Sequence, residues 1–216
     1  MSEIIKSVGE IDVLVACAAS SGGSSEMKLA KDTRTEDMAE IYKTNVIGLH
    51  HLIHEFLAQT STGSTASGPR SVIHVSSNGT QMYHPGGSGY SSSKSAATRL
   101  VTHFAVEQPA ESNVKFYSFH PGAIKSALSE ENVKDFEIAF EDGMSQLRIL
   151  MEIKSSTDTE DNLVRLPEDF AVWLASPEAE FLNGRFVWAE WDVDELVAMR
   201  GKLASDQNLL TVSIAL

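Results

Sequence analysis

A tyrosine and a lysine lie four residues apart at Tyr90 and Lys94. Residues at positions i and i+4 share one face of a helix, so this spacing predicts that the two side chains are neighbours. A phenol has a pKa of about 10, and a neighbouring ammonium group favours the phenolate. The pair therefore predicts a tyrosine whose pKa is lowered toward the working range of an acid/base catalyst.

Two other polar residues can take part in the same chemistry. Ser77 lies thirteen residues before Tyr90, at the end of an apolar segment that reads as a strand, and its hydroxyl can hydrogen-bond a substrate oxygen there. Asn45 lies among apolar residues in a helical pattern. Its amide needs a buried partner, such as a backbone carbonyl or a water molecule. Asn45, Ser77, Tyr90 and Lys94 are the predicted catalytic residues.

Predicted strands and helices alternate along the chain and position these residues. The apolar run 11–19 suits a strand buried on both faces of a parallel sheet. The pattern then predicts a helix over 34–59, a strand over 71–77, a helix over 90–107 and a strand over 114–119. Further on it predicts a helix over 168–174 opened by Pro167, a strand over 185–188, a helix over 192–202, and an apolar tail over 209–216 that adds an edge strand or a subunit contact. This alternation is typical of a doubly wound parallel sheet in one α/β domain over 1–216, with 123–163 as a substrate lid.

Composition excludes several classes of protein. The 216 residues carry a net charge of −13, which argues against nucleic-acid binding because phosphate contacts need a basic surface. One cysteine, Cys17, is incompatible with an intrachain disulfide, and we expect it to be a small buried side chain. The sequence contains no apolar stretch long enough to cross a membrane and no signal-peptide pattern, so we expect a cytoplasmic protein.

Several segments together resemble the short-chain dehydrogenase/reductase family, in a fungal branch. Ser77, Tyr90 and Lys94 have the spacing of its active-site residues, and the Asn-Val-Ile-Gly sequence at 45–48 matches its Asn-x-x-Gly element. The other matching segments are 12–19 with the family's Asn-Asn-Ala-Gly turn, 120–126 with its Pro-Gly-x-x-x-Thr segment, 181–184 with its last-strand turn, and 170–177 with 188–192 for the fungal branch.

The resemblance implies a Rossmann-like fold and an NAD- or NADP-dependent oxidoreductase that acts on a carbonyl or alcohol of a small molecule. It implies that Tyr90 donates or accepts the proton, that Lys94 lowers its pKa and holds the nicotinamide ribose, and that Ser77 orients the carbonyl. It also implies that Asn45 supports a water molecule and a helix kink in a proton relay. The cofactor-binding residues implied are Ala18, Tyr90, Lys94, Pro121, Gly122, Ile124 and Ser126. A homodimer or higher homo-oligomer through the helices at 34–59 and 90–107 is implied as well.

One expected motif is missing from the sequence. The family's Thr-Gly-x-x-x-Gly-x-Gly turn does not precede Ile11, and the stretch 20–24 lacks its glycine spacing. We therefore expect a sheet that is incomplete at the N-terminus, with 12–15 as an uncovered edge strand. Ala19 also has a Cβ where glycine would favour close approach of a cofactor. NAD, NADP and no cofactor thus all stay open. So do two alternative functions: a cofactor-independent isomerase, dehydratase or cyclase that reuses Ser77, Tyr90 and Lys94, and a non-catalytic dimerising pseudoenzyme.

The histidines were considered as metal ligands and as residues near the substrate site. His50 and His54 have the i, i+4 spacing of a zinc site, but no third ligand is evident, so we interpret them as a helix surface or subunit contact and predict no metal site. His84 and His120 flank the predicted substrate site, one before Tyr90 and one after a predicted strand.

Overall fold

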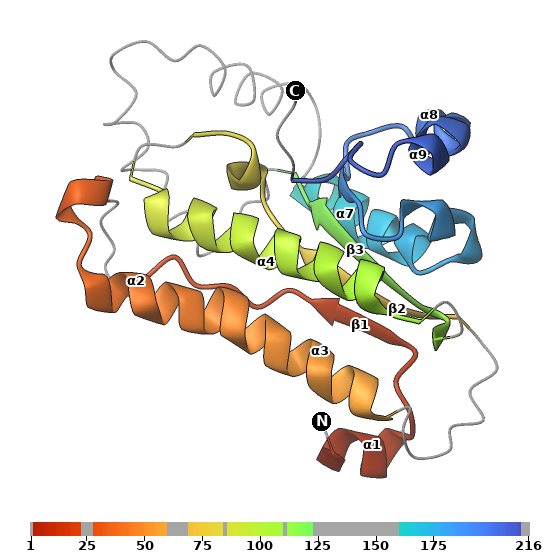
Figure 1. The fold of residues 1–216 in the computed structure, drawn as a ribbon, viewed down its shortest axis with the longest axis horizontal. Coiled ribbons are helices and arrows are strands. Elements are labelled where there is room, and N and C mark those ends of the chain that lie inside the picture. The colour runs from red at the N-terminus through yellow and green to blue at the C-terminus, as the bar shows by residue number, and fades with distance from the viewer. Residues whose placement is uncertain are drawn as a thin grey trace.

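A parallel sheet forms the centre of the computed structural model, which describes residues 2–22, 28–59, 69–83, 86–109, 112–122 and 160–212. Within these residues the sheet has four strands in the order β1-β2-β3-β4 (Figure 1). The strands are β1 (Val13–Ala16), β2 (Arg70–Val75), β3 (Val114–His120) and β4 (Phe186–Trp188). All three pairings are parallel, and Val72 of β2 lies opposite Phe116 of β3. The prediction of a Rossmann-like parallel α/β sheet is confirmed.

Long helices cover one face of this sheet. The predicted helix over 34–59 is confirmed as a continuous helical segment made of α2 (Thr35–Tyr42), a π-helical turn η2 (Lys43–Gly48) and α3 (Leu49–Ala58). The next helix, α4 (Ser88–Glu107), begins two residues earlier than predicted and runs beside α3 (Figure 1). One hydrophobic core lies between these helices and the sheet, and its buried residues are Ala16, Leu49, Ile53, Phe56, Val72, Ala97, Val101, Val114 and Phe116.

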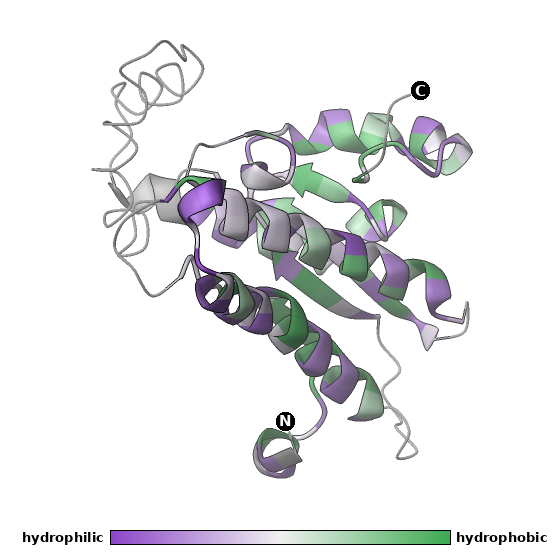
Figure 2. Ribbon diagram, turned by 60° about the vertical axis from the view of Figure 1, so that its left-hand side comes forward, coloured by the Kyte–Doolittle hydropathy of each residue, from purple (hydrophilic) through white to green (hydrophobic). Residues whose placement is uncertain are grey.

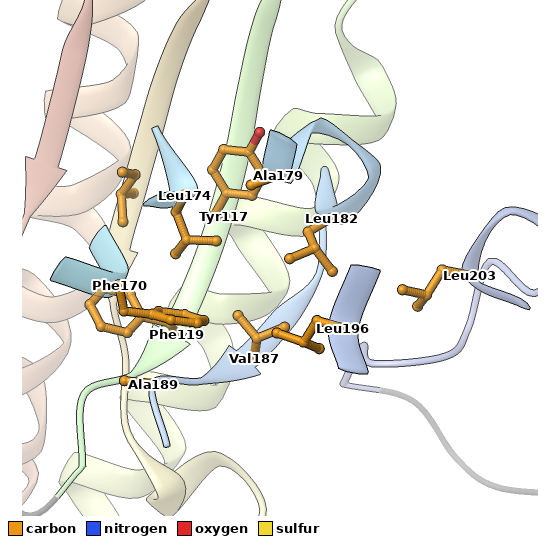
Figure 3. Packing of buried hydrophobic residues seen from close by; sticks show 11 residues of the cluster. Tyr117, Phe119, Phe170, Leu174, Ala179, Leu182, Val187, Ala189, Leu196 and Leu203 are labelled. Atoms are coloured by element: carbon orange, nitrogen blue, oxygen red, sulfur yellow. The ribbon is translucent and has the colours of Figure 1, made fainter. Parts of the chain in front are cut away.

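A second core lies on the opposite face. Successive residues of a strand point to opposite faces, so Ile73 and Tyr117 face away from the first core. They pack against α7 (Glu160–Leu174), η6 (Pro177–Leu182), α8 (Val193–Ala198) and α9 (Arg200–Ser205) (Figure 3). Helices on both faces explain why the strands are mostly hydrophobic (Figure 2). Three short elements, α1 (Ser2–Val8), η1 (Ala30–Asp32) and η4 (Asn78–Thr80), complete the described structure.

Strand β1 lies at an edge of the sheet. Among the described residues it pairs only with β2. This pairing agrees with the predicted edge position of 12–15 within the described part of the chain. The expectation of burial on both faces is wrong, because Val13 is 40% exposed and Val15 is 48% exposed. Cys17, which follows the strand, is also exposed and not buried as predicted.

The C-terminal part differs from the prediction in its boundaries. Pro167 lies inside α7 and does not open a helix. It is buried, and it shares one face of the helix with Phe170 and Leu174, three and seven residues later. The predicted helix over 192–202 is two helices, α8 and α9, and the Asp192 side chain caps the first by accepting from the Glu195 amide at 3.0 Å.

Two other predictions fall partly or wholly outside the described residues. The lid predicted over 123–163 lies outside them except for 160–163, which belong to α7. The tail predicted from 209 is described only as far as 212, where it forms turns, and the Leu210 carbonyl accepts from the Phe186 amide of β4 at 2.7 Å. No helix in the described ranges is long and apolar enough to span a membrane.

Candidate active site

Ser77 follows β2 and opens the short turn η4. Its side chain accepts a hydrogen bond from the Gly79 amide at 3.1 Å, so the hydroxyl caps this turn. Gly79 lies against α4, since a Cβ there would lie 2.8 Å from the Ser91 hydroxyl. A glycine is thus required for the turn to approach the first turns of α4. This approach brings Ser77 beside Tyr90.

Tyr90 lies in the first turn of α4, with its ring half-buried and its hydroxyl close enough to interact with the Ser77 side chain. Burial raises the pKa of Tyr90, and the interaction with the Ser77 side chain offsets part of this rise. The net direction is opposite to the one that we expected from the Lys94 neighbour. Desolvation of the phenolate outweighs the favourable interactions of the ionised form.

Lys94 lies on the same face of α4, one turn further along. Its side chain is 2% exposed, and its Nζ lies 5.8 Å from the centre of the Tyr90 ring. The same Nζ donates to the Val75 carbonyl, the last of β2, at 2.8 Å. Burial lowers the pKa of Lys94 to about 8. The ammonium and neutral forms of this lysine are therefore both accessible near neutral to mildly alkaline pH.

Asn45 connects three segments of the site. It lies in the π-helical turn and is 2% exposed. Its Oδ1 accepts from the Ser20 amide at 2.7 Å, while its Nδ2 donates to the Ser20 carbonyl at 2.8 Å and to the Ser93 hydroxyl at 2.9 Å. A backbone carbonyl was one of the two buried partners that we considered for this amide. The side chain fastens the loop after β1 to α4.

Three of the residues implied for cofactor binding follow strands at the carboxyl edge of the sheet. Ala18 follows β1 and is exposed, while Pro121 and Gly122 follow β3. Gly122 has a φ of +86°, and a Cβ there would lie 3.1 Å from Oε1 of Glu190. Both observations favour glycine at this position. Ile124 and Ser126 lie outside the described residues.

Sequence reasoning missed a buried polar layer beneath the site. His74 of β2 is 3% exposed, and its Nδ1 lies 3.3 Å from the Ser118 hydroxyl. Burial, together with the nearby Lys94 charge, holds the pKa of His74 well below its usual value. The ring is therefore neutral at physiological pH. The signal available in the sequence was one histidine between the apolar residues Ile73 and Val75 of a strand.

The histidines that the sequence singled out have different surroundings. His120, at the end of β3, is buried, and its Nδ1 accepts from the amide of Asn78, the residue after Ser77, at 3.2 Å. It thus contacts the predicted site, whereas His84 lies outside the described residues. The rings of His50 and His54 stack on the surface of α3 with centroids 6.4 Å apart. In the described part of the chain, no group of three His, Cys, Asp or Glu side chains is arranged to hold a metal ion.

The sequence was compared with protein-family models and with known proteins. The family model of short chain dehydrogenases matches residues 1–137. Short chain dehydrogenase/reductase AacuD of Aspergillus aculeatus is 37% identical over 215 residues, which cover 99% of this chain and 65% of that protein. Hydroxynaphthalene reductase of Aspergillus fumigatus is 26% identical over 191 residues, which cover 86% of this chain and 64% of that protein.

A solved structure agrees with these matches. The 3-oxoacyl-[acyl-carrier protein] reductase from Brucella melitensis in complex with NAD is 20% identical, with a TM-score of 0.68 over 87% of this chain and 69% of that one. This likeness concerns the fold. The chain spans between 64% and 66% of the length of the first three curated relatives. Because the family model matches residues 1–137, more than half of the 216 residues, the chain belongs to the short-chain dehydrogenase/reductase family.

Proposed function

We propose that this chain supplies the catalytic and substrate-binding residues of a nicotinamide-dependent oxidoreductase that acts on a carbonyl or alcohol of a small molecule. The observation that carries the proposal is the placement of the Ser77 side chain beside Tyr90, with Lys94 buried one helical turn away. These three groups can bind one substrate oxygen and exchange one proton with it.

Each side chain has a distinct task in the reduction of a carbonyl. The Ser77 hydroxyl donates to the substrate oxygen and orients it toward Tyr90. The Tyr90 hydroxyl transfers its proton to that oxygen and becomes a phenolate, which the Lys94 ammonium stabilises. Oxidation of an alcohol returns the proton to Tyr90.

The residues at the carboxyl edge fit the nicotinamide end of NAD or NADP. Gly122 adopts a backbone conformation that favours glycine, and Lys94 presents an ammonium next to Tyr90. Lys94, Ala18 and the 121–122 segment would hold that end of the cofactor. The bound nicotinamide would supply the hydride that reduces the carbonyl carbon.

Turnover with a matched pair of tyrosine variants tests the proposal. We expect the purified chain to oxidise NADH or NADPH in the presence of a hydroxynaphthalene, chosen from the name of the Aspergillus fumigatus relative. Tyr90→Phe should lower the rate by roughly 10²- to 10⁴-fold, the usual contribution of a general acid. Tyr83→Phe, which alters a side chain that is 92% exposed, should leave it unchanged.

Nucleotide binding, measured together with this turnover, separates the proposed function from the alternatives. Absence of NADH and NADPH binding in calorimetry at millimolar cofactor would overturn cofactor-dependent activity for this chain. Turnover without nucleotide that Tyr90→Phe abolishes would instead identify an isomerase, dehydratase or cyclase. Nucleotide binding with equal rates for Tyr90→Phe and wild type would remove Tyr90 from the mechanism.

We also propose that the protein is cytoplasmic and forms a homodimer or higher homo-oligomer through the helices at 34–59 and 90–107, which are α2–α3 and α4, without nucleic-acid or membrane partners. The two helices lie side by side on the outer layer of the fold (Figure 1), which supports such a contact. Sedimentation of the purified chain at micromolar concentration tests it, and a monomeric mass would contradict it.

A further inference from the structure

Two tryptophans stack on each other at the same edge of the sheet as the site. Trp188 is the last residue of β4, and Trp191 follows three residues later. Their rings stack with centroids 6.4 Å apart and an interplanar angle of 13°. Trp191 is 36% exposed and Trp188 is half-buried. We refer to Trp188 and Trp191 as the tryptophan shelf.

The shelf is attached to the segment that carries Ser77. The indole N–H of Trp188 donates to Oε1 of Gln81 at 3.3 Å, and Gln81 follows η4. His120 packs its ring edge against Trp188 with centroids 4.7 Å apart, while its Nδ1 accepts from the Asn78 amide. The orientation of Trp188 is thus fixed by two residues at the same edge of the sheet as the Ser77 turn.

Packing of the core does not account for this pair. In the described residues, neither tryptophan belongs to the two hydrophobic cores, whereas Trp173 packs against one of them with its ring 5.4 Å from Phe170. A large aromatic ring left exposed forgoes the free energy that its burial would supply. A flat ligand that covers the indoles would recover it.

The charge next to the shelf narrows the class of ligand. Glu190 lies between the two tryptophans in the chain, and its carboxylate lies against Gly122. An anionic ligand would be repelled by this carboxylate, whereas a hydroxyl group could donate to it. The combination favours an uncharged ring system with a hydroxyl or ketone oxygen.

We propose that the tryptophan shelf stacks the planar ring system of the substrate, an uncharged fused-ring ketone or phenol, while its oxygen faces Ser77 and Tyr90. The inference rests on the proposed function for the identity of the ligand as a substrate. The stacking itself requires neither cofactor nor turnover, because aromatic pairs attract through their ring faces.

Binding of two bicyclic compounds to the purified chain, without nucleotide, tests the shelf. The probes are 2-naphthol, which is planar, and trans-2-decalone, which is saturated. We expect 2-naphthol to bind more tightly than trans-2-decalone in calorimetry. Trp188→Leu and Trp191→Leu should each weaken 2-naphthol binding by roughly three- to tenfold, the affinity equivalent of one aromatic pair. Neither variant should change the binding of trans-2-decalone by a comparable factor.

Control variants keep the result interpretable. Trp173→Phe alters the core tryptophan and should leave 2-naphthol affinity at the wild-type value. Trp191→Phe retains an aromatic ring at the exposed position and should recover most of the affinity that Trp191→Leu loses, provided that circular dichroism shows all variants folded. Equal 2-naphthol affinity in wild type, Trp188→Leu and Trp191→Leu would overturn the inference, and so would absence of 2-naphthol binding to wild type. Shelf-dependent binding together with unchanged turnover in Tyr90→Phe would retain the shelf and reject the proposed function.

Discussion

The two edge strands of the sheet, β1 and β4, differ both in the exposure of their side chains and in the residues that follow them. At the β1 edge the strand is open, with Val13 and Val15 exposed, but the loop after it is held by three hydrogen bonds of Asn45. At the β4 edge Phe186 and Val187 are fully buried, but the half-buried Trp188 ends the strand and the exposed Trp191 follows it. The β1 edge therefore provides rigid positioning through Asn45, and the β4 edge carries the surface that we propose for ligand recognition.

The largest effect is expected from removal of the Asn45 amide, which holds the loop after β1. Asn45→Ala leaves the Ser20 amide, the Ser20 carbonyl and the Ser93 hydroxyl without this partner. We expect a loss of about 3 kcal/mol in the free energy of unfolding, because each buried polar group that loses its partner costs about 1 kcal/mol or more. Urea unfolding measures it. Ser93→Ala removes one of these contacts and should cost about a third as much; an equal cost would show that the loop after β1 is not held by Asn45.

The lysine between the two edges makes stability depend on pH. Burial lowers the folded-state pKa of Lys94 to about 8, below the unfolded value, so the unfolded chain binds the extra proton above pH 8. The buried ammonium lowers the free energy of unfolding below pH 8, and this free energy therefore increases as pH rises from about 8 to about 10. We expect wild type to gain about 2 kcal/mol over this window relative to Lys94→Met. Unfolding in urea at several pH values measures it.

A second lysine variant serves as the control for this pH dependence. Lys202→Met removes an exposed lysine of α9, and its unfolding curve should stay parallel to that of wild type. A constant difference between wild type and Lys94→Met across the window would contradict the burial argument.

His120 connects the β4 edge to the Ser77 turn and can be tested by two substitutions of opposite design. His120→Asn places an amide oxygen where Nδ1 accepts from the Asn78 amide, whereas His120→Leu removes the acceptor. We expect His120→Leu to lose about 1 kcal/mol of stability through that contact and His120→Asn to lose less. Thermal unfolding compares the two variants. Equal destabilisation would mean that the Nδ1 acceptor of His120 does not contribute to stability.

The smallest effect is expected on the open strand. Val15→Thr should change the free energy of unfolding by less than about 0.5 kcal/mol, because the side chain is 48% exposed. Val187→Thr, the matched change in β4, should cost about 1–2 kcal/mol, since Val187 is 0% exposed and the hydroxyl would lack a partner. Chemical denaturation of both variants checks the difference, and similar costs would remove the distinction between the two edges.

Local sequence patterns predicted those features of the fold and of the site that depend on residues close together in the chain. The i, i+4 spacing placed Lys94 beside Tyr90, and the alternation of apolar segments predicted the parallel sheet. The direction of the Tyr90 pKa was not predictable, because burial depends on the whole fold and the spacing showed only the charged neighbour. The same limit applies to Val13 and Val15: their hydrophobicity indicates a strand, while their exposure depends on which chain segments lie next to them.

Contacts between distant segments were also beyond the sequence. That Asn45 was buried with a partner followed from its apolar neighbours, but Ser20 and Ser93 as those partners required the fold. His120 was placed near the site by its position after a strand, whereas its bond to the Asn78 amide was not foreseeable. The stacking of Trp188 on Trp191 likewise depends on a chain turn after β4 that no short motif specifies.

The π-helical turn at 43–48 sets the phase between the two helices that flank it. An α-helix rotates by about 100° per residue, so deleting one residue in this turn would rotate α2 relative to α3 by about that angle. Met38 and Ile41 of α2 now lie against Gly89 of α4, where a Cβ would lie 2.8 Å from Cδ1 of Ile41. A rotated α2 would present other residues there, while Leu49 and Ile53 would keep their places in the core. Length variation in this turn therefore acts as a rotary adjustment of α2 around the start of the Tyr90 helix.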